Sequence, residues 1–98
     1  MNIDFEDVVF RWEARTDAAW YFTAVPEDLS ELISEIPRPE RGFGAVRVEA
    51  RIGLTRWRTS IFPSADGRYT LPLKKSVRDA EGLQDGGPVS VSLTVLDA

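Results

Sequence analysis

Apolar and polar residues alternate along several short stretches of the chain, a pattern typical of β-strands with one buried face. With the turn residues between them, these stretches predict about six strands. The predicted strands are residues 4–14, 19–25, 44–53, 54–62, 68–73 and 88–96. Only a polar turn at residues 15–17 separates the first two, which are therefore expected to form a hairpin.

The alternation also predicts which side chains point into the core. In the first strand, the apolar face carries Val8, Phe10, Trp12 and Ala14, and the opposite face carries Asp7, Val9, Arg11 and Glu13. The inward residues expected in later strands are Val46, Val48, Ala50 and Ile52; Trp57, Thr59 and Ile61; and Val89, Val91, Leu93 and Val95. One face of each strand is thus expected to be buried.

Two stretches have helical rather than strand spacing. Pro26 begins the first helix, at a position where its missing N–H costs nothing. Its apolar stripe, at i, i+3, i+4 and i+7, consists of Leu29, Leu32, Ile33 and Ile36. Pro37 ends this helix and opens the longest loop, residues 37–44, which is expected to be the most mobile segment. A second, basic helix is predicted at residues 75–81 and stops at Gly82.

The connections between the strands are mostly too short for parallel crossovers, so antiparallel pairing is expected. Asp66-Gly67 is a strong hairpin signal, and Gly86-Gly87 marks a tight turn before the last strand. A closed sheet removes exposed strand edges. The sequence therefore predicts a mainly β fold with two short helices, a small closed antiparallel barrel formed by residues 1–98 as a single domain.

Several short motifs resemble one known family. They are Phe10, residues 19–22 (AWYF), Pro26, residues 57–60 (WRTS), the Asp66-Gly67 turn, residues 69–74 (YTLPLK), residues 77–80 (VRDA) and Gly82-Leu83. Together they resemble the domain of unknown function 1905 family of small bacterial and archaeal proteins. The resemblance implies a double-split β-barrel, an architecture shared with AbrB-type regulators and MazE-type antitoxins, which bind DNA as intertwined dimers. Gly86-Gly87 departs from the Gly-Asp usual in those regulators.

Composition narrows the possible chemistry. The 98 residues include no His and no Cys, so a Ser-His-Asp or Cys-His mechanism cannot be assembled, and most zinc and haem ligands are missing. No cofactor or metal is expected, and a non-enzymatic protein is favoured. No apolar run approaches the roughly 20 residues that cross a bilayer, and residues 1–10 do not resemble a secretory signal. Without disulfides, a cytoplasmic location and no membrane partner are expected.

Charge is segregated along the chain, although the net charge is −4. Residues 1–37 sum to −7, residues 38–78 to +7 and residues 79–98 to −4. The basic segment supplies the candidate binding residues, which are Arg47, Arg51, Arg56, Arg58, Lys74, Lys75 and Arg78. Arg side chains match phosphate and carboxylate oxygens in a bidentate manner, so this stripe predicts a site for an anionic small molecule, a peptide or a protein partner.

Other interpretations stay open. The basic residues could instead pair with the acidic N-terminal half of the chain. An AbrB-like DNA-binding dimer is a further alternative, but the acidic remainder of the chain disfavours nucleic acid. The aromatic residues, among them Trp12, Trp20 and Trp57, are expected to fill the core rather than to line a ligand pocket.

Overall fold

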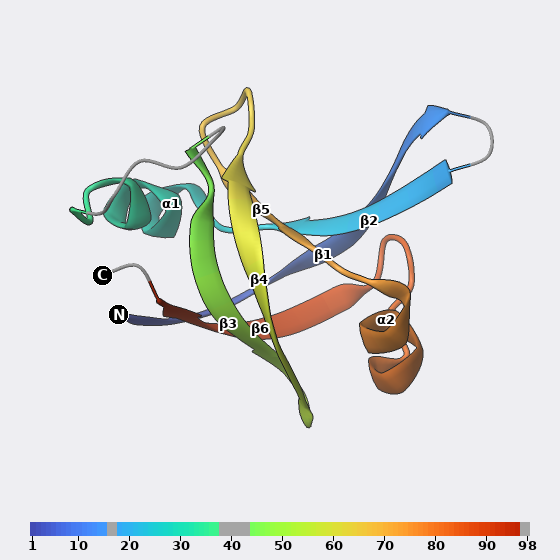
Figure 1. The fold of residues 1–98 in the computed structure, drawn as a ribbon. Coiled ribbons are helices and arrows are strands. Elements are labelled where there is room, and N and C mark those ends of the chain that lie inside the picture. The colour runs from blue at the N-terminus through green and yellow to red at the C-terminus, as the bar shows by residue number, and fades with distance from the viewer. Residues whose placement is uncertain (16–17, 38–43, 97–98) are drawn as a thin grey trace.

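The computed structural model describes residues 1–15, 18–37 and 44–96. Its strands are β1 (Asn2–Arg15), β2 (Ala18–Ala24), β3 (Val46–Ile52), β4 (Thr55–Pro63), β5 (Tyr69–Pro72) and β6 (Pro88–Val95). Helix α1 (Glu27–Ser34) follows β2, and helix α2 (Lys75–Glu81) follows β5 (Figure 1). The fold is mainly β with two short helices, as the alternation predicts.

The strands form a closed barrel in the order β1-β2-β5-β4-β3-β6, and β6 returns to β1. Every neighbouring pair is antiparallel. The predicted small closed antiparallel barrel is therefore confirmed. Within the described ranges, neither helix is long and apolar enough to cross a membrane.

The longest strand, β1, takes part in two successive pairings. Residues Asn2 to Val8 pair with β6, and residues Val9 to Arg15 pair with β2. At the change of partner, the N–H of Val9 donates to the Gly87 carbonyl at 2.8 Å, and the N–H of Gly86 donates to the Val9 carbonyl at 2.7 Å. Beyond this point the predicted β1–β2 hairpin extends away from the rest of the barrel (Figure 1). Residues 16 and 17 of its turn lie outside the described residues.

The inward faces of β3, β4 and β6 agree with the predicted alternation. The buried residues on these strands are Val46, Val48, Ala50, Ile52, Trp57, Ile61, Val89, Val91, Leu93 and Val95, and Thr59 is half-buried. Tyr69, Leu71 and Leu73 complete the core from the segment around β5. Strands with one polar and one apolar face leave a single way to pack, which is why their orientation follows from the sequence.

The predicted inward face of β1 is wrong. Val9 is fully buried, whereas Val8 is 49% exposed and Trp12 is 54% exposed. The pairing with β6 decides this orientation, because Ile3 lies opposite Leu93 and Phe5 opposite Val91, and residues directly opposite in an antiparallel pair share a face. From Ile3 to Val9, the inward row of β1 is therefore the odd-numbered one. The side chains of Glu13 and Ala14 lie outside the described residues.

Helix α1 keeps most of its predicted apolar stripe but not all of it. Ile33 is fully buried, and Leu29 and Ile36 pack against the core. Leu32, however, is 48% exposed, and Ser30 is buried in its place. The Ser30 hydroxyl donates to the Val25 carbonyl at 3.1 Å and accepts from the N–H of Tyr69 at 3.0 Å, so it joins the end of β2 to the start of β5. The buried face of α1 therefore includes one polar residue, Ser30, and differs from the purely apolar stripe that the sequence predicts.

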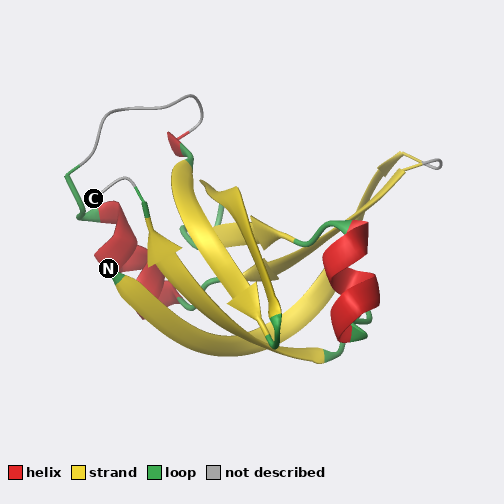
Figure 2. Cartoon of the chain, turned by 60° about the horizontal axis from the view of Figure 1, so that its bottom comes forward, coloured by secondary structure: helices red, strands yellow, loops and turns green. Residues whose placement is uncertain are grey.

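The second helix and the turns around it match the predictions. Helix α2 spans the predicted residues, and Gly82 ends it in the left-handed conformation, with φ of 64°. Gly86 also has a positive φ, 81°, as the tight turn before β6 requires. Figure 2 shows α1 and α2 on opposite sides of the strands. Of the loop predicted to be mobile, residues 38–43 lie outside the described residues.

The orientation of β1 can be tested with two adjacent valines. We expect Val9→Ala to lower the free energy of unfolding by about 2 kcal/mol, because it removes buried methyl groups and leaves a cavity. Val8→Ala should change it by no more than about 0.5 kcal/mol, because Val8 lies on the outer face. Urea unfolding followed by circular dichroism measures both. Equal losses for the two variants would contradict the orientation described here.

Candidate functional site

The outward face of β1, β2 and β5 carries a group of exposed and half-buried side chains, most of them apolar. We call this surface the aromatic groove. It consists of Val8, Phe10 and Trp12 from β1, Trp20, Phe22 and Ala24 from β2, Phe62 from β4, and Thr70 and Pro72 from β5. Trp12 and Trp20, each 54% exposed, are the most exposed aromatic residues of the described chain. The prediction that the three tryptophans fill the core is therefore wrong for Trp12 and Trp20, and it is confirmed for Trp57.

Strand pairing brings these side chains to one face. Trp12 lies opposite Trp20, and Phe10 lies opposite Phe22. The row continues across β5, because Phe22 pairs with Pro72 and Ala24 with Thr70. Cross-strand neighbours project to the same side of a sheet. Since Val9 of β1 points into the barrel, Phe10 and Trp12 must face outward, together with Trp20 and Phe22 of β2.

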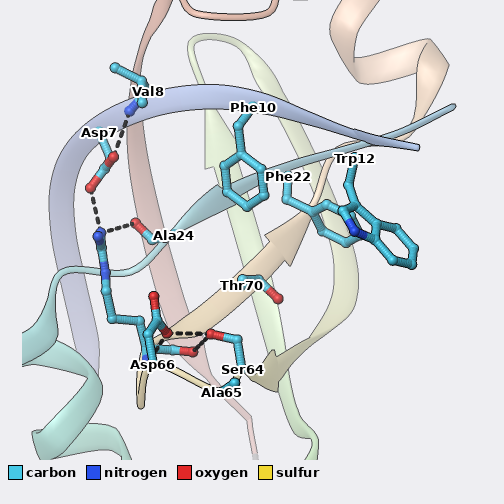
Figure 3. Close-up of a pocket in the computed structure, with 11 residues that line it drawn as sticks. Asp7, Val8, Phe10, Trp12, Phe22, Ala24, Ser64, Ala65, Asp66 and Thr70 are labelled. Carbon is cyan, nitrogen blue, oxygen red and sulfur yellow. Dashed lines mark hydrogen bonds and ion pairs between the residues drawn. The ribbon is translucent and has the colours of Figure 1, made fainter. Parts of the chain in front are cut away.

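Two adjoining cavities define the shape of the aromatic groove. One has a volume of about 590 Å³ and runs from the β4–β5 turn to Trp12. The other, of about 360 Å³, lies between Trp12, Trp20 and Phe62. They share Trp12, Phe22 and Thr70, and so form one continuous depression. Figure 3 shows Phe10, Phe22 and Trp12 on one side of the larger cavity and Ser64 and Asp66 on another. Each volume is within the range typical of ligand sites.

The aromatic rings lie in an ordered row. The ring centroids of Phe10 and Phe22 are 5.8 Å apart with an interplanar angle of 30°. Those of Trp20 and Phe22 are 6.5 Å apart and nearly parallel, at 8°. Such offset stacking stabilises each ring by its neighbour. Phe10, Phe22 and Trp20 are consequently held in one arrangement rather than as independent side chains.

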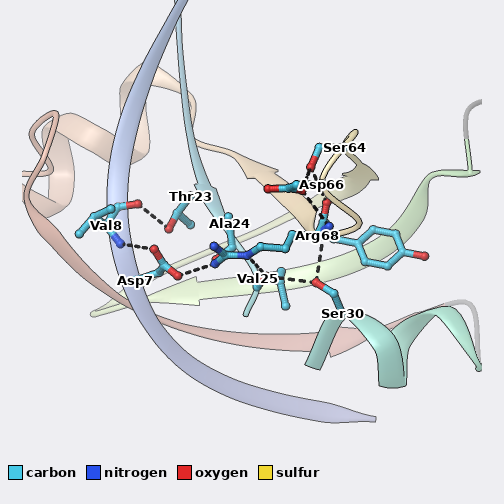
Figure 4. A network of polar contacts seen from close by, with 10 residues as sticks. Asp7, Val8, Thr23, Ala24, Val25, Ser30, Ser64, Asp66 and Arg68 are labelled. Carbon is cyan, nitrogen blue, oxygen red and sulfur yellow. Dashed lines mark hydrogen bonds and ion pairs between the residues drawn. The ribbon is translucent and has the colours of Figure 1, made fainter. Parts of the chain in front are cut away.

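An ion pair forms the polar end of the aromatic groove. Arg68 Nη2 lies 2.6 Å from Asp7 Oδ2, and both side chains are about three-quarters buried. The same guanidinium donates to the Val25 carbonyl at 2.9 Å and to the Ala24 carbonyl at 3.1 Å (Figure 4). Asp7 belongs to the inward row of β1, opposite Val89, where a charge requires a partner. Arg68 therefore ties β1 to the end of β2 and to the β4–β5 turn.

Next to the ion pair, the β4–β5 turn presents Asp66. Its Oδ1 accepts hydrogen bonds from the Ser64 hydroxyl and from the N–H of Arg68. The Ser64 hydroxyl has the larger effect and the Arg68 N–H the next, and both hold the pKa of Asp66 below its usual value of 3.8. Asp66 is exposed and therefore carries a full negative charge at neutral pH. The three charged groups at this end, Asp7, Asp66 and Arg68, sum to −1.

The predicted basic residues fall into two groups. Arg47, Arg51, Arg56 and Arg58 project from the outward faces of β3 and β4, as expected. Glu49 lies between two of them, with its carboxylate 3.6 Å from Arg56 Nε and 3.9 Å from Arg58 Nε. Arg51 makes no ion pair with any residue that the structure describes, and lines polar cavities of about 270 and 460 Å³ with Asp4 and Ser92.

The second group lies on and before α2. Lys75 pairs with Asp79 at 2.6 Å, one helical turn away. Arg78 donates to the Leu73 carbonyl at 3.0 Å, and its guanidinium carbon lies 3.9 Å from the ring centroid of Tyr21. Lys74 is exposed at the N-terminus of the helix. Most of the seven residues thus have partners within the chain. An anion site formed by them stays a prediction. Arg51 and Lys74 are exposed members of the group without an ion pair to any described residue.

The fold and the aromatic groove together define a small closed antiparallel β-barrel with an open aromatic face. A family model described as a domain of unknown function (DUF1905) matches residues 5–93. The chain therefore belongs to the DUF1905 family, in agreement with the resemblance of its motifs. A comparison with curated proteins gives no match. In the described part of the chain, no group of three or more Asp or Glu residues is placed to hold a metal ion.

The sequence contains a signal for the aromatic groove that the alternation obscured. Val8, Val9 and Phe10 are consecutive apolar residues, so both faces of β1 are apolar in this region. The facing strand has a similar run at residues 18–24. A hairpin with two apolar faces cannot bury both in a barrel of this size, and one of them must remain outside. The sequence does not show which one.

The structural role of Arg68 gives a stability prediction. We expect Arg68→Ala to lower the free energy of unfolding by about 2–3 kcal/mol, because it leaves Asp7 without its ion-pair partner and removes one donor each from the Ala24 and Val25 carbonyls. Arg68→Lys should lose less, since it keeps the charge but not the planar fork. Arg56→Ala, which removes an exposed ion pair, is the control and should cost at most about 1 kcal/mol. Chemical denaturation that ranks Arg56→Ala with Arg68→Ala would contradict this role.

The turn gives a prediction about ionisation. Ser64→Ala removes the main cause of the lowered pKa of Asp66, so this pKa should rise towards 3.8. Because the folded-state pKa lies below the unfolded one, Asp66 stabilises the fold above the unfolded pKa, and this contribution fades as the pH falls through the folded pKa. In Ser64→Ala, this stabilising contribution of Asp66 is therefore lost at a higher pH than in the unmodified protein. Carbon NMR of the Asp66 carboxyl measures the change, with Ser76→Ala on α2 as control. An unaltered pKa in Ser64→Ala would refute the explanation.

Proposed function

We propose that this protein is a non-catalytic binding domain, and that the aromatic groove binds an extended segment of a partner protein. The observation that carries the proposal is the row of aromatic side chains on the outer face from Phe10 to Trp20, in which Phe10 and Phe22 are half-buried and both tryptophans are about half exposed. A small barrel gains stability from burying such residues. Their exposure on one contiguous face is typical of a surface that is covered in a complex.

The composition of the aromatic groove supports a protein partner. Tryptophan is enriched among the residues that dominate binding energy at interfaces, where it is surrounded by less important contacts. Here two tryptophans, Trp12 and Trp20, lie opposite one another and are flanked by Phe22, Phe62 and Pro72. Phe22 and Pro72, both half-buried, give the groove a firm floor, while the tryptophans remain accessible.

The dimensions support an extended ligand. From Val8 to Trp12 the groove follows β1 for four residue steps, which corresponds to about 14 Å. It is open along this length rather than closed around a compact cavity, because residues at both ends, Val8 and Trp12, are about half exposed. A peptide of about four or five residues in an extended conformation spans the same distance.

A non-catalytic role is consistent with the groups that line the aromatic groove. Asp7 is paired with Arg68, and one oxygen of Asp66 accepts two hydrogen bonds. The sequence supplies no His or Cys as base or nucleophile. We favour this surface over the basic residues because Arg56, Arg58 and Lys75 already have carboxylate partners. Those contacts also weaken the case for a DNA-binding dimer, since phosphate contacts would have to replace them.

Selection from a random linear peptide library tests the proposal. We expect the folded protein to enrich apolar peptides whose affinity falls at least tenfold in Trp12→Ala and in Trp20→Ala, as is usual for dominant interface residues. Leu32→Ala is the matched control, because Leu32 is exposed to a similar degree but lies on α1. Circular dichroism confirms that each variant is folded.

Two results would reject the proposal. One is the failure of the library to yield any enriched peptide. The other is enrichment of peptides that bind the two tryptophan variants as tightly as the unmodified protein.

A further inference from the structure

The aromatic groove lies over strands that are already paired, and this restricts what it can bind. Beneath it, residues 9–12 of β1 pair with β2, and residues 22–24 of β2 pair with β5, so the backbone groups along these paired edges are used within the sheet. The floor therefore offers side chains and almost no backbone donors or acceptors. A bound peptide in β conformation would place N–H groups against this apolar floor without partners, and each such loss is costly.

The two tryptophans change this balance in favour of a ligand rich in carbonyl groups. Each indole has one N–H donor and no acceptor. The structure gives neither Trp12 nor Trp20 a hydrogen-bond partner among the described residues, and both are about half exposed. The groove thus presents donors and apolar rings. A polyproline II segment complements it, because its prolines lack N–H groups and its carbonyls point outward.

The charge at the polar end of the aromatic groove determines which ligand side chain fits there. Arg68 is ion-paired with Asp7, so the three charged groups there keep a net charge of −1, and Asp66 is the exposed carboxylate among them. The hydrogen bonds from the Ser64 hydroxyl and the N–H of Arg68 both fall on Oδ1, and the Asp66 side chain is exposed, so its carboxylate is accessible to a donor from a ligand. The net charge of the chain, −4, also disfavours an acidic partner. A cationic side chain fits this end.

Resting on the proposed function, we propose that the aromatic groove recognises a proline-containing segment in polyproline II conformation, with a lysine or arginine beside Asp66. The prolines pack between the rings of Trp12, Trp20 and Phe22, and their carbonyls accept from the indoles. A polyproline II chain rises about 3.1 Å per residue, so about five residues cover the roughly 14 Å between the two ends. The cation therefore lies about four or five residues from the proline at the tryptophans.

Synthetic peptides test the two elements of this recognition separately. The probes are acetyl-RSAPLPAP-amide and its reverse, acetyl-PAPLPASR-amide, because polyproline II ligands can bind in either direction. Each is matched by a peptide with glutamate in place of arginine and by one with alanine in place of every proline. Binding is followed by amide shifts in NMR titrations of the full chain.

We expect one arginine peptide to bind, with its largest shifts in β1, β2 and the β4–β5 turn. The glutamate peptide should bind about fivefold more weakly at low salt, and this difference should vanish at high salt or in Asp66→Asn, since an exposed pair is modest and screened. Asparagine retains the acceptor for Ser64 and Arg68, so the turn should persist. The alanine peptide should be at least fivefold weaker.

Each failure has a distinct meaning. Equal binding of the arginine and glutamate peptides would overturn the cationic specificity, and equal binding of the alanine peptide would overturn the polyproline II conformation. Failure of both arginine probes to bind would overturn this inference as a whole. Groove-dependent library peptides without proline or a basic residue would also overturn it, while leaving the proposed function intact. Only the absence of any groove-dependent peptide would reject both.

Discussion

The arrangement of this protein depends on the passage of β1 from one partner strand to another. Its first half is held in register against β6, where Ile3 faces Leu93 and Phe5 faces Val91 inside the barrel. Because side chains alternate along a strand, that register dictates the orientation of everything that follows. Val9 is then buried, and Phe10 and Trp12 must face outward. The aromatic groove is therefore a consequence of barrel closure at the opposite end of the same strand.

The ion pair between Asp7 and Arg68 stands where this change of partner occurs. Asp7 immediately precedes the last β1 residue paired with β6, and Arg68 reaches it from the β4–β5 turn while also binding the carbonyls at the end of β2. The ion pair that holds β1 where it changes partner strand thus also forms the floor of the polar end of the aromatic groove. Stability and the proposed binding surface share these two residues. For this reason Asp66, which lies in the β4–β5 turn and takes no part in the Asp7–Arg68 ion pair, is a better residue than Asp7 or Arg68 for altering specificity without unfolding the protein.

How much the sequence could predict differs between elements for a physical reason. In β3 and β6, polar residues such as Arg47 and Ser92 alternate with apolar ones, so a single orientation hides the apolar face. Helix α2 was equally well defined, because Gly82 supplies a clear end. In β1, the run from Val8 to Phe10 makes two orientations equally good locally, so the alternation alone does not distinguish them. In helix α1, the spacing of apolar residues does not predict that Ser30 is buried, because its burial depends on hydrogen bonds to Val25 and from Tyr69, which lie outside the helix.

By itself, the sequence determined the strand and helix order, the closed antiparallel barrel, the inward rows of β3 and β6, and the family to which the chain belongs. These features follow from local alternation and turn chemistry, which act over a few residues. Three features follow from the packing of the whole chain: Trp12 and Trp20 lie outside, Glu49 contacts both Arg56 and Arg58, and Asp7 pairs with Arg68. Each of these depends on register between strands distant in sequence or on the geometry of closure, and such information is absent from any single segment of the chain.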